Sequence, residues 1–168
     1  MVKVFTRALI SQFEAALCML QECIKKCPPE HWESKIANDS FRQIAYHTLF
    51  FFDLYLSQNE GDFRLLDYHL EGGDERASYE PSKGLSREAT LAYLADCHDK
   101  AVSILADETI ETLDGESGFS RLPFSRGELH LHSLRHIQHH VGQLSAFLRK
   151  VIEDQGSWWV RDGWRDCH

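Results

Sequence analysis

The sequence predicts an all-α fold, a four-helix bundle with a long crossover between helices 2 and 3. Four segments carry apolar residues at the three- and four-residue spacing of a helix that buries one face. No run of alternating β-branched residues indicates a strand. Residues 59–85, between the second and third segments, are rich in Gly, Asp, Glu and Ser and are long for an ordinary connection. We therefore expect a single domain over residues 1–168, in which this connection either crosses the bundle or forms a lid.

The first two predicted helices have recognisable ends. The first covers residues 6–26 and stops before Pro28, because proline disfavours helical backbone at the residue that precedes it. The second begins near Ser40, which has Gln43 three residues further on in the pattern of a capping box. Its apolar pattern fades near residue 59, where the polar connection begins.

The last two predicted helices begin with the same kind of signal. The third starts near Ser86 and carries apolar residues as far as Leu105. The fourth starts at Ser125, where Glu128 completes a second capping box, and extends to Gly156, a common helix stop. The chain then continues into a tail with three tryptophans, whose large apolar rings we expect to pack on the bundle or on a neighbouring subunit: Trp158, Trp159 and Trp164.

Composition and charge exclude several classes of protein. A hydrophobic content of 43% and an aromatic content of 11% exclude a disordered chain. Asp and Glu number 26 against 18 Lys and Arg, a net charge of −8 that argues against nucleic-acid and anionic-membrane partners. The most apolar stretch, residues 45–56, is interrupted by His47 and Asp53 and is too short to cross a bilayer. With no secretion signal at the N-terminus, we expect a cytoplasmic protein.

The five cysteines do not indicate a disulfide framework. Their number is odd and their spacing is wide, so we expect reduced thiols: Cys18, Cys23, Cys27, Cys97 and Cys167. Cys23 and Cys27 share a helix face, but the sequence has no CxxC pair, and we interpret both as small residues of the helix.

Histidines on the fourth predicted helix form the clearest candidate site. Five of the ten histidines lie between positions 130 and 140. At 100° per residue, His136 and His140 lie on the flank of the apolar stripe, about 6 Å apart along the axis. Two imidazoles at this i, i+4 spacing can converge on one ion. Gln143 lies on the same flank one turn later, next to the two expected ligands.

The neighbouring positions on this helix have other expected roles. His132 and His139 lie further towards solvent, and together with His130 we expect them at the surface. His132 with His136 is nevertheless a rival i, i+4 pair. Gly142 lowers helix stability, so its lack of a side chain indicates a close approach by a ligand or a neighbouring helix.

A second helix has to supply the third ligand, and His47 is the candidate. It lies within the apolar arc of the second predicted helix and should point into the bundle. A buried imidazole needs partners for its nitrogens; a metal ion would be one, and a carboxylate or backbone carbonyl the other. The alternative is a hydrogen-bonded core histidine without a metal.

Other chemistries lack their signatures. The sequence has no HExxH, no acid three residues before any histidine, no glycine-rich phosphate loop and no GxSxG. A mononuclear site with three neutral imidazoles fits best, with a divalent metal ion, zinc or nickel first, as its cofactor. An open fourth position would activate water or a thiol, and so allow hydroxide attack or thiolate attack. The sequence assigns no general base, although Asp67, His69 and Glu71 are available in the connection.

The segment His-Ile-Gln-His-His-Val-Gly-Gln, which starts at His136, resembles the HxxxHxGQ signature of the DinB-like superfamily, which includes the YfiT-like metal-dependent hydrolases. The resemblance implies a four-helix bundle with a long middle crossover, often a dimer, with a divalent ion on His47, His136 and His140 by matching positions. Similar proteins include transferases that use bacillithiol or mycothiol, and a thiol-dependent maleylpyruvate isomerase. Val141 departs from the pattern, since many members carry arginine there.

We therefore expect a metal-dependent enzyme that acts on a small molecule, specifically an S-transferase for a low-molecular-weight thiol. A metal-dependent hydrolase and a non-catalytic, stress-associated binding bundle are the alternatives. The resemblance also implies a homodimer.

Overall fold

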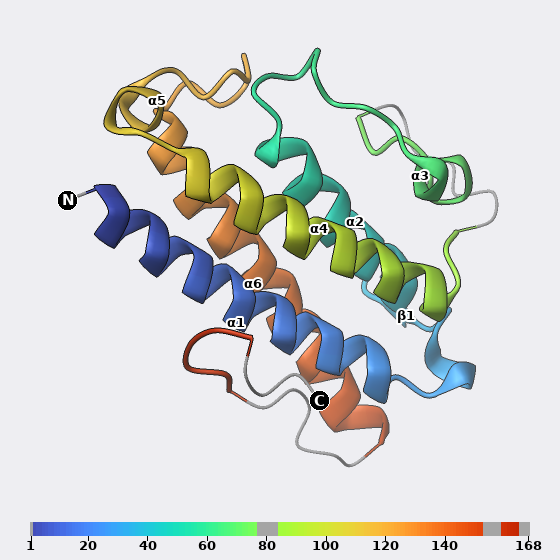
Figure 1. The fold of residues 1–168 in the computed structure, drawn as a ribbon. Coiled ribbons are helices and arrows are strands. Elements are labelled where there is room, and N and C mark those ends of the chain that lie inside the picture. The colour runs from blue at the N-terminus through green and yellow to red at the C-terminus, as the bar shows by residue number, and fades with distance from the viewer. Residues whose placement is uncertain (1, 77–83, 153–158, 165–168) are drawn as a thin grey trace.

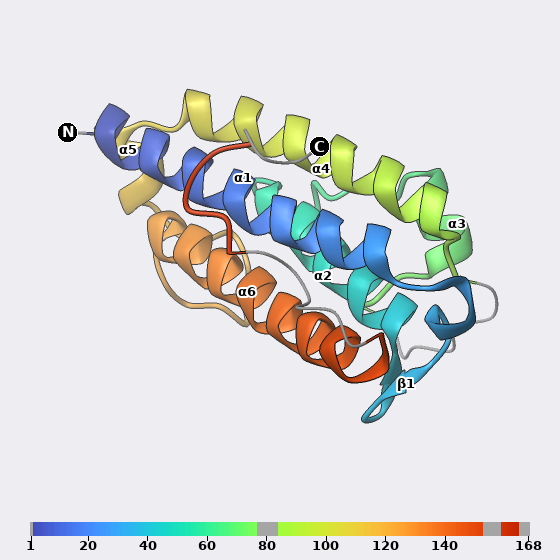
Figure 2. The same ribbon diagram turned by 90° about the horizontal axis from the view of Figure 1, so that it is seen from below.

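The computed structural model describes residues 2–76, 84–152 and 159–164. Four long helices make up most of this part of the chain: α1 (Val2–Lys26), α2 (Phe41–Leu56), α4 (Arg87–Asp107) and α6 (Arg126–Val151). Helices α1 and α2 each pack against both α4 and α6, and Figures 1 and 2 show the four lying alongside one another. The predicted all-α bundle is confirmed.

The direction of the helices explains the long crossover. In Figure 1 the colours show that α2 and α4 run the same way along the bundle, so the connection between them has to bring the chain back along its length. The described part of this connection contains a short helix, α3 (Asp67–Gly72), which packs on α4. A second short helix, α5 (Ile110–Asp114), lies between α4 and α6.

Both predicted capping boxes are present, and they set where two helices begin. The Ser40 hydroxyl accepts from the backbone N–H of Gln43, whose side-chain oxygen accepts from the Ser40 N–H. Ser125 and Glu128 make the same reciprocal pair at the start of α6. The other ends differ by a few residues: α1 begins earlier than expected, α2 ends at Leu56, and α6 ends at Val151, whereas Gly156 lies outside the described residues.

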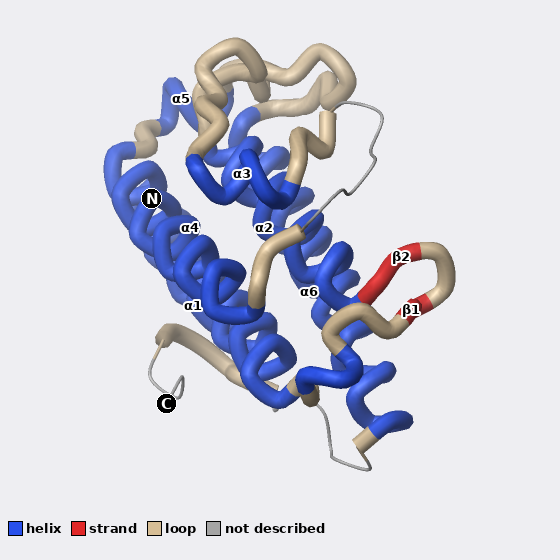
Figure 3. The backbone as a smooth tube through the Cα atoms, turned by 90° about the vertical axis from the view of Figure 1, so that its right-hand side faces the viewer, coloured by secondary structure: helices blue, strands red, loops and turns tan. Residues whose placement is uncertain are grey.

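A small hairpin precedes α2, which the sequence did not indicate. After a 3-10 turn at Pro29–His31, strands β1 (Lys35–Ile36) and β2 (Asp39–Ser40) pair antiparallel, Lys35 opposite Ser40. The strands have two residues each, too few for an alternating pattern to appear. Figure 3 shows the hairpin projecting beside the start of α2.

A buried ion network joins the ends of two helices. Arg126, the first residue of α6, donates to the carbonyls of Leu56 and Ser57 at the end of α2 and to Oε1 of Glu108, at 3.1, 2.7 and 2.8 Å. His130 Nε2 lies 2.9 Å from the same Glu108 oxygen. The expectation that His130 lies at the surface is therefore wrong, because the residues that follow α4 bring Glu108 over this face and bury the ring.

Two other expectations meet a mixed outcome. Cys23, Cys27 and Cys97 are buried thiols, as expected, but Cys18 is disulfide-bonded, which corrects the prediction there. Trp164 packs on His98 with ring centroids 4.3 Å apart, as expected, whereas Trp159 is 76% exposed in the single chain and does not pack on the bundle. Cys167 and Trp158 lie outside the described residues.

Among the described helices, none is both long and apolar enough to cross a membrane.

Candidate metal centre

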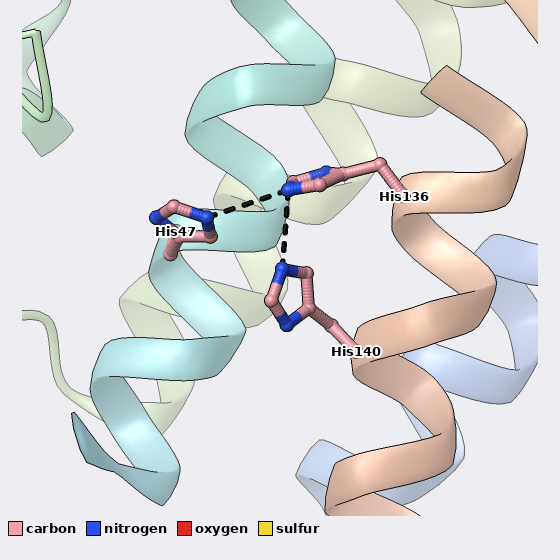
Figure 4. A group of neighbouring side chains, drawn as sticks. All are labelled: His47, His136 and His140. Carbon is pink, nitrogen blue, oxygen red and sulfur yellow. Dashed lines mark hydrogen bonds between the residues drawn. The ribbon is translucent and has the colours of Figure 1, made fainter. Parts of the chain in front are cut away.

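Three imidazoles from two helices converge at one point on the side of the bundle. His47 comes from α2, while His136 and His140 come from successive turns of α6 (Figure 4). The Nε2 atom of His136 lies 3.3 Å from that of His47 and 3.1 Å from that of His140. One ligand atom from each ring lies within 4.8 Å of the other two. The structure thus brings together the three residues that the sequence selected.

These separations suit a shared ion. Two nitrogens bound tetrahedrally to zinc, each at about 2.0–2.1 Å, lie about 3.3 Å apart. Two of the three separations are therefore already at the spacing of a coordination sphere, and all three lie within 4.8 Å. The three residues fit a divalent metal ion.

The outward nitrogens of two of the three histidines are held by acceptors. His47 Nδ1 lies 3.2 Å from Glu75 Oε2, and His140 Nδ1 lies 2.9 Å from the amide oxygen of Gln143. A carboxylate and an amide oxygen only accept, so each Nδ1 carries the proton and each Nε2 presents a lone pair to the centre. Of the two partners considered for His47, a carboxylate or a backbone carbonyl, the structure has a carboxylate, that of Glu75, and the Gln143 amide lies next to His140.

The third histidine, His136, differs from the other two. His136 Nδ1 is buried and has no hydrogen-bond partner among the described residues. Burial, and then the neighbouring His140 and His47, lower the pKa of His136 to about 3. Burial also lowers the pKa of His140. Both rings are therefore neutral donors at physiological pH, the form that a metal ion needs.

The centre reaches the surface at His47. Its side chain is 34% exposed. Within the described residues, no fourth histidine, cysteine or acidic side chain joins the cluster. Three protein ligands with access to solvent are typical of a catalytic metal site, whereas structural sites have four.

Aromatic rings extend from the centre along the bundle. Phe51 lies one turn after His47. The centroid of its ring is 4.8 Å from that of the His47 ring and 5.9 Å from that of the His136 ring. Tyr55 follows, 5.7 Å from Phe51 and 5.8 Å from His132. These rings are half-buried. His132 therefore belongs to this aromatic surface and does not join the metal ligands, which removes the rival His132–His136 pair.

Other residues singled out in the sequence lie elsewhere. His69 is buried and bonds to Tyr93, whose hydroxyl donates to Asp53, in a network between α2, α3 and α4. Asp67 is exposed at the start of α3, and the side chain of Glu71 lies outside the described residues. His139 is exposed, as expected. A Cβ added to Gly142 would meet none of the described residues within 4 Å, so the expected close approach by a neighbouring helix is wrong.

Glu75 is the residue that the sequence did not select. It lies in a charged, aperiodic stretch of the crossover, where nothing distinguishes it from its acidic neighbours. Glu75 is brought next to His47 by the way the crossover folds against α2, which the sequence pattern does not reveal.

A protein-family model described as the DinB superfamily matches residues 12–144. No curated protein and no solved structure matches the chain. The matched span contains the crossover and all three histidines, and it covers most of the sequence. The chain therefore belongs to the DinB superfamily.

Proposed function

We propose that this protein is a divalent-metal-dependent enzyme that transfers a low-molecular-weight thiol to a small electrophile. The observation that carries the proposal is the convergence of three Nε2 atoms, 3.1 and 3.3 Å apart, beside a partly exposed His47. The alternative of a structural metal would require a fourth ligand, which the described residues do not supply. Imidazole donors suit zinc, nickel, copper and iron alike, and of these we propose zinc or nickel.

A divalent ion held by three neutral imidazoles keeps its full charge and lowers the pKa of a thiol or water that binds beside it. The protein's own residues hold this arrangement. His47 and His140 carry their protons on Nδ1, and these N–H groups donate hydrogen bonds to Glu75 and Gln143. The lone pair of each Nε2 therefore remains available to a metal ion. The neutral form of His136 is secured by its burial.

The sulfur nucleophile comes from the co-substrate. Burial raises the pKa of Cys27 to about 12 and that of Cys97 well above its usual value. Neither thiol ionises near neutral pH. In the proposed reaction the external thiol loses its proton to water, a carbon–sulfur bond forms, and the bond from that carbon to the leaving group breaks, releasing an anion.

The half-buried rings of Phe51 and Tyr55 would bind the apolar part of the electrophile. They begin next to His47 and His136 and continue along α2. An aromatic or planar co-substrate can stack on such rings within reach of the centre.

The test measures conjugation directly. Zinc- or nickel-loaded protein is mixed with cysteine, glutathione, bacillithiol or mycothiol and with monochlorobimane, and adduct formation is followed by fluorescence. We expect acceleration by wild type, and none by His136→Ala loaded in the same way. Acceleration of p-nitrophenyl ester hydrolysis without any thiol would favour the hydrolase instead. Absence of both activities in metal-loaded protein would contradict an enzymatic role.

A further inference from the structure

Residues 73–76 of the crossover are held by three kinds of contact, one to the bundle, one within the segment and one to another part of the crossover. The hydroxyl of Tyr46, on α2, donates to the carbonyl of Gly73. The Arg76 guanidinium pairs with Asp74 and lies 5.2 Å from the centre of the Phe63 ring. These contacts hold the backbone on both sides of residue 75, and so determine where its side chain goes.

Between these anchors, Glu75 points to the metal centre. Its carboxylate is only 11% exposed, and Oε2 lies 3.2 Å from Nδ1 of His47. The three ligands therefore have different outward partners: a carboxylate from the crossover for His47, an amide of the same helix for His140, and no partner among the described residues for His136.

We propose that Glu75 is a positioning residue of the metal centre, through which the crossover strengthens metal binding at His47. The proposal rests on the metal site of the proposed function. A carboxylate that accepts the Nδ1 proton fixes the tautomer and the ring orientation, and it makes Nε2 a stronger donor. It also places one negative charge close to an ion that three neutral ligands leave uncompensated.

The contact works in both directions, because coupled binding is reciprocal. If docking of residues 73–76 strengthens metal binding at His47, then a bound metal stabilises the docked crossover to the same extent. Metal occupancy thereby becomes linked to the position of a segment that runs past the site. A purely structural salt bridge would give no such link.

The first measurement is zinc affinity, determined by competition with a chromophoric chelator. We expect Glu75→Ala to bind zinc roughly 10- to 100-fold more weakly than wild type, and Glu75→Gln to lose less, because its amide oxygen still accepts a hydrogen bond. Asp67→Asn is the matched control, since it removes the same charge from the same crossover at an exposed position. It should bind zinc like wild type. Thermal unfolding of each variant checks that it folds.

The second measurement is amide hydrogen exchange of residues 73–76 with and without zinc. Zinc should slow exchange in wild type and in Asp67→Asn, but not in Glu75→Ala. Wild-type affinity in Glu75→Ala, together with undiminished protection by zinc, would overturn the proposal for Glu75 and leave the metal site intact. Failure of the wild type to bind zinc at all would instead contradict the proposed function, on which this inference rests.

Discussion

The Nε2 atoms of His47 and His136 lie 3.3 Å apart, although the two residues are 89 positions apart in the sequence. A second nitrogen, Nε2 of His140, lies 3.1 Å from the same His136 atom. If His136 carried its proton on Nε2, that N–H could donate to only one of the two neighbours. A cation satisfies all three lone pairs together, and for this reason we interpret the cluster as a metal centre.

The partly buried His136 makes the metal-free protein sensitive to acid. Burial and the adjacent imidazoles lower the pKa of His136 from 6.5 to about 3. Between these pH values the ring is protonated in the unfolded chain but not in the folded chain. Stability should therefore fall as the pH drops from 6.5 towards 3. Urea unfolding of metal-free protein at several pH values measures this fall. We expect a smaller slope for His136→Leu, and identical slopes would contradict this assignment.

Glu108 should determine stability through its buried pair with Arg126. Their side chains are 4% and 3% exposed, so Glu108→Gln leaves the guanidinium buried without its counter-charge. We expect a loss of about 3–5 kcal/mol in the free energy of unfolding. Glu111→Gln, at an exposed position on α5, is the control and should change the free energy of unfolding far less. Equal losses in the two variants would show that the buried pair has no special role.

The same glutamate gives a second pH dependence at lower pH. Burial alone would raise its pKa, but hydrogen bonds from His130, Thr112 and Arg126 outweigh burial and hold the pKa of Glu108 at about 2, against 4.5 in the unfolded chain. This stabilisation is complete above pH 4.5 and is lost as the pH falls towards 2, on the order of 3 kcal/mol in all. In Glu108→Gln this part of the acid transition should be missing.

The buried cysteines should be unreactive in the folded protein. Because burial raises the pKa of Cys27 to about 12 and that of Cys97 well above its usual value, neither forms a thiolate at pH 8. Iodoacetamide labelling, mapped by mass spectrometry, should modify both only after denaturation. Rapid labelling of either thiol in native protein would reopen the question of an internal nucleophile.

Phe51 should affect substrate binding more than the chemical step. Its ring lies 4.8 Å from His47, so Phe51→Ala removes a stacking surface beside the centre. We expect KM for monochlorobimane to rise roughly 2- to 10-fold, with a smaller change in kcat. Leu131→Ala removes an exposed apolar side chain of α6 and serves as the control. An unchanged KM at unchanged metal content would place the electrophile elsewhere.

Local signals explain why so much of the centre could be predicted. The capping boxes at Ser40 and Ser125 set the start of α2 and α6, and helical geometry then places His136 and His140 one turn apart on one flank. His47 was predictable because it interrupts an apolar arc that has to face the bundle. Each inference depends only on residues within a few turns of one another.

The contacts that sequence reasoning missed are all long-range. Glu75 reaches His47 because Tyr46 and Phe63 hold its neighbours, and no periodicity marks such docking. His130 is buried because Glu108, from the segment after α4, covers it. An angular position on a single helix cannot reveal a cover supplied by another part of the chain.

The zinc content of the protein tests most directly whether the three histidines bind one metal ion together. Wild type, His136→Ala and His139→Ala are loaded with zinc, separated from free metal and measured by elemental analysis; His139 is an exposed neighbour on the same helix. We predict about one zinc ion per chain in wild type and in His139→Ala, and little or none in His136→Ala. Equal zinc content in wild type and His136→Ala would contradict a metal centre at these residues.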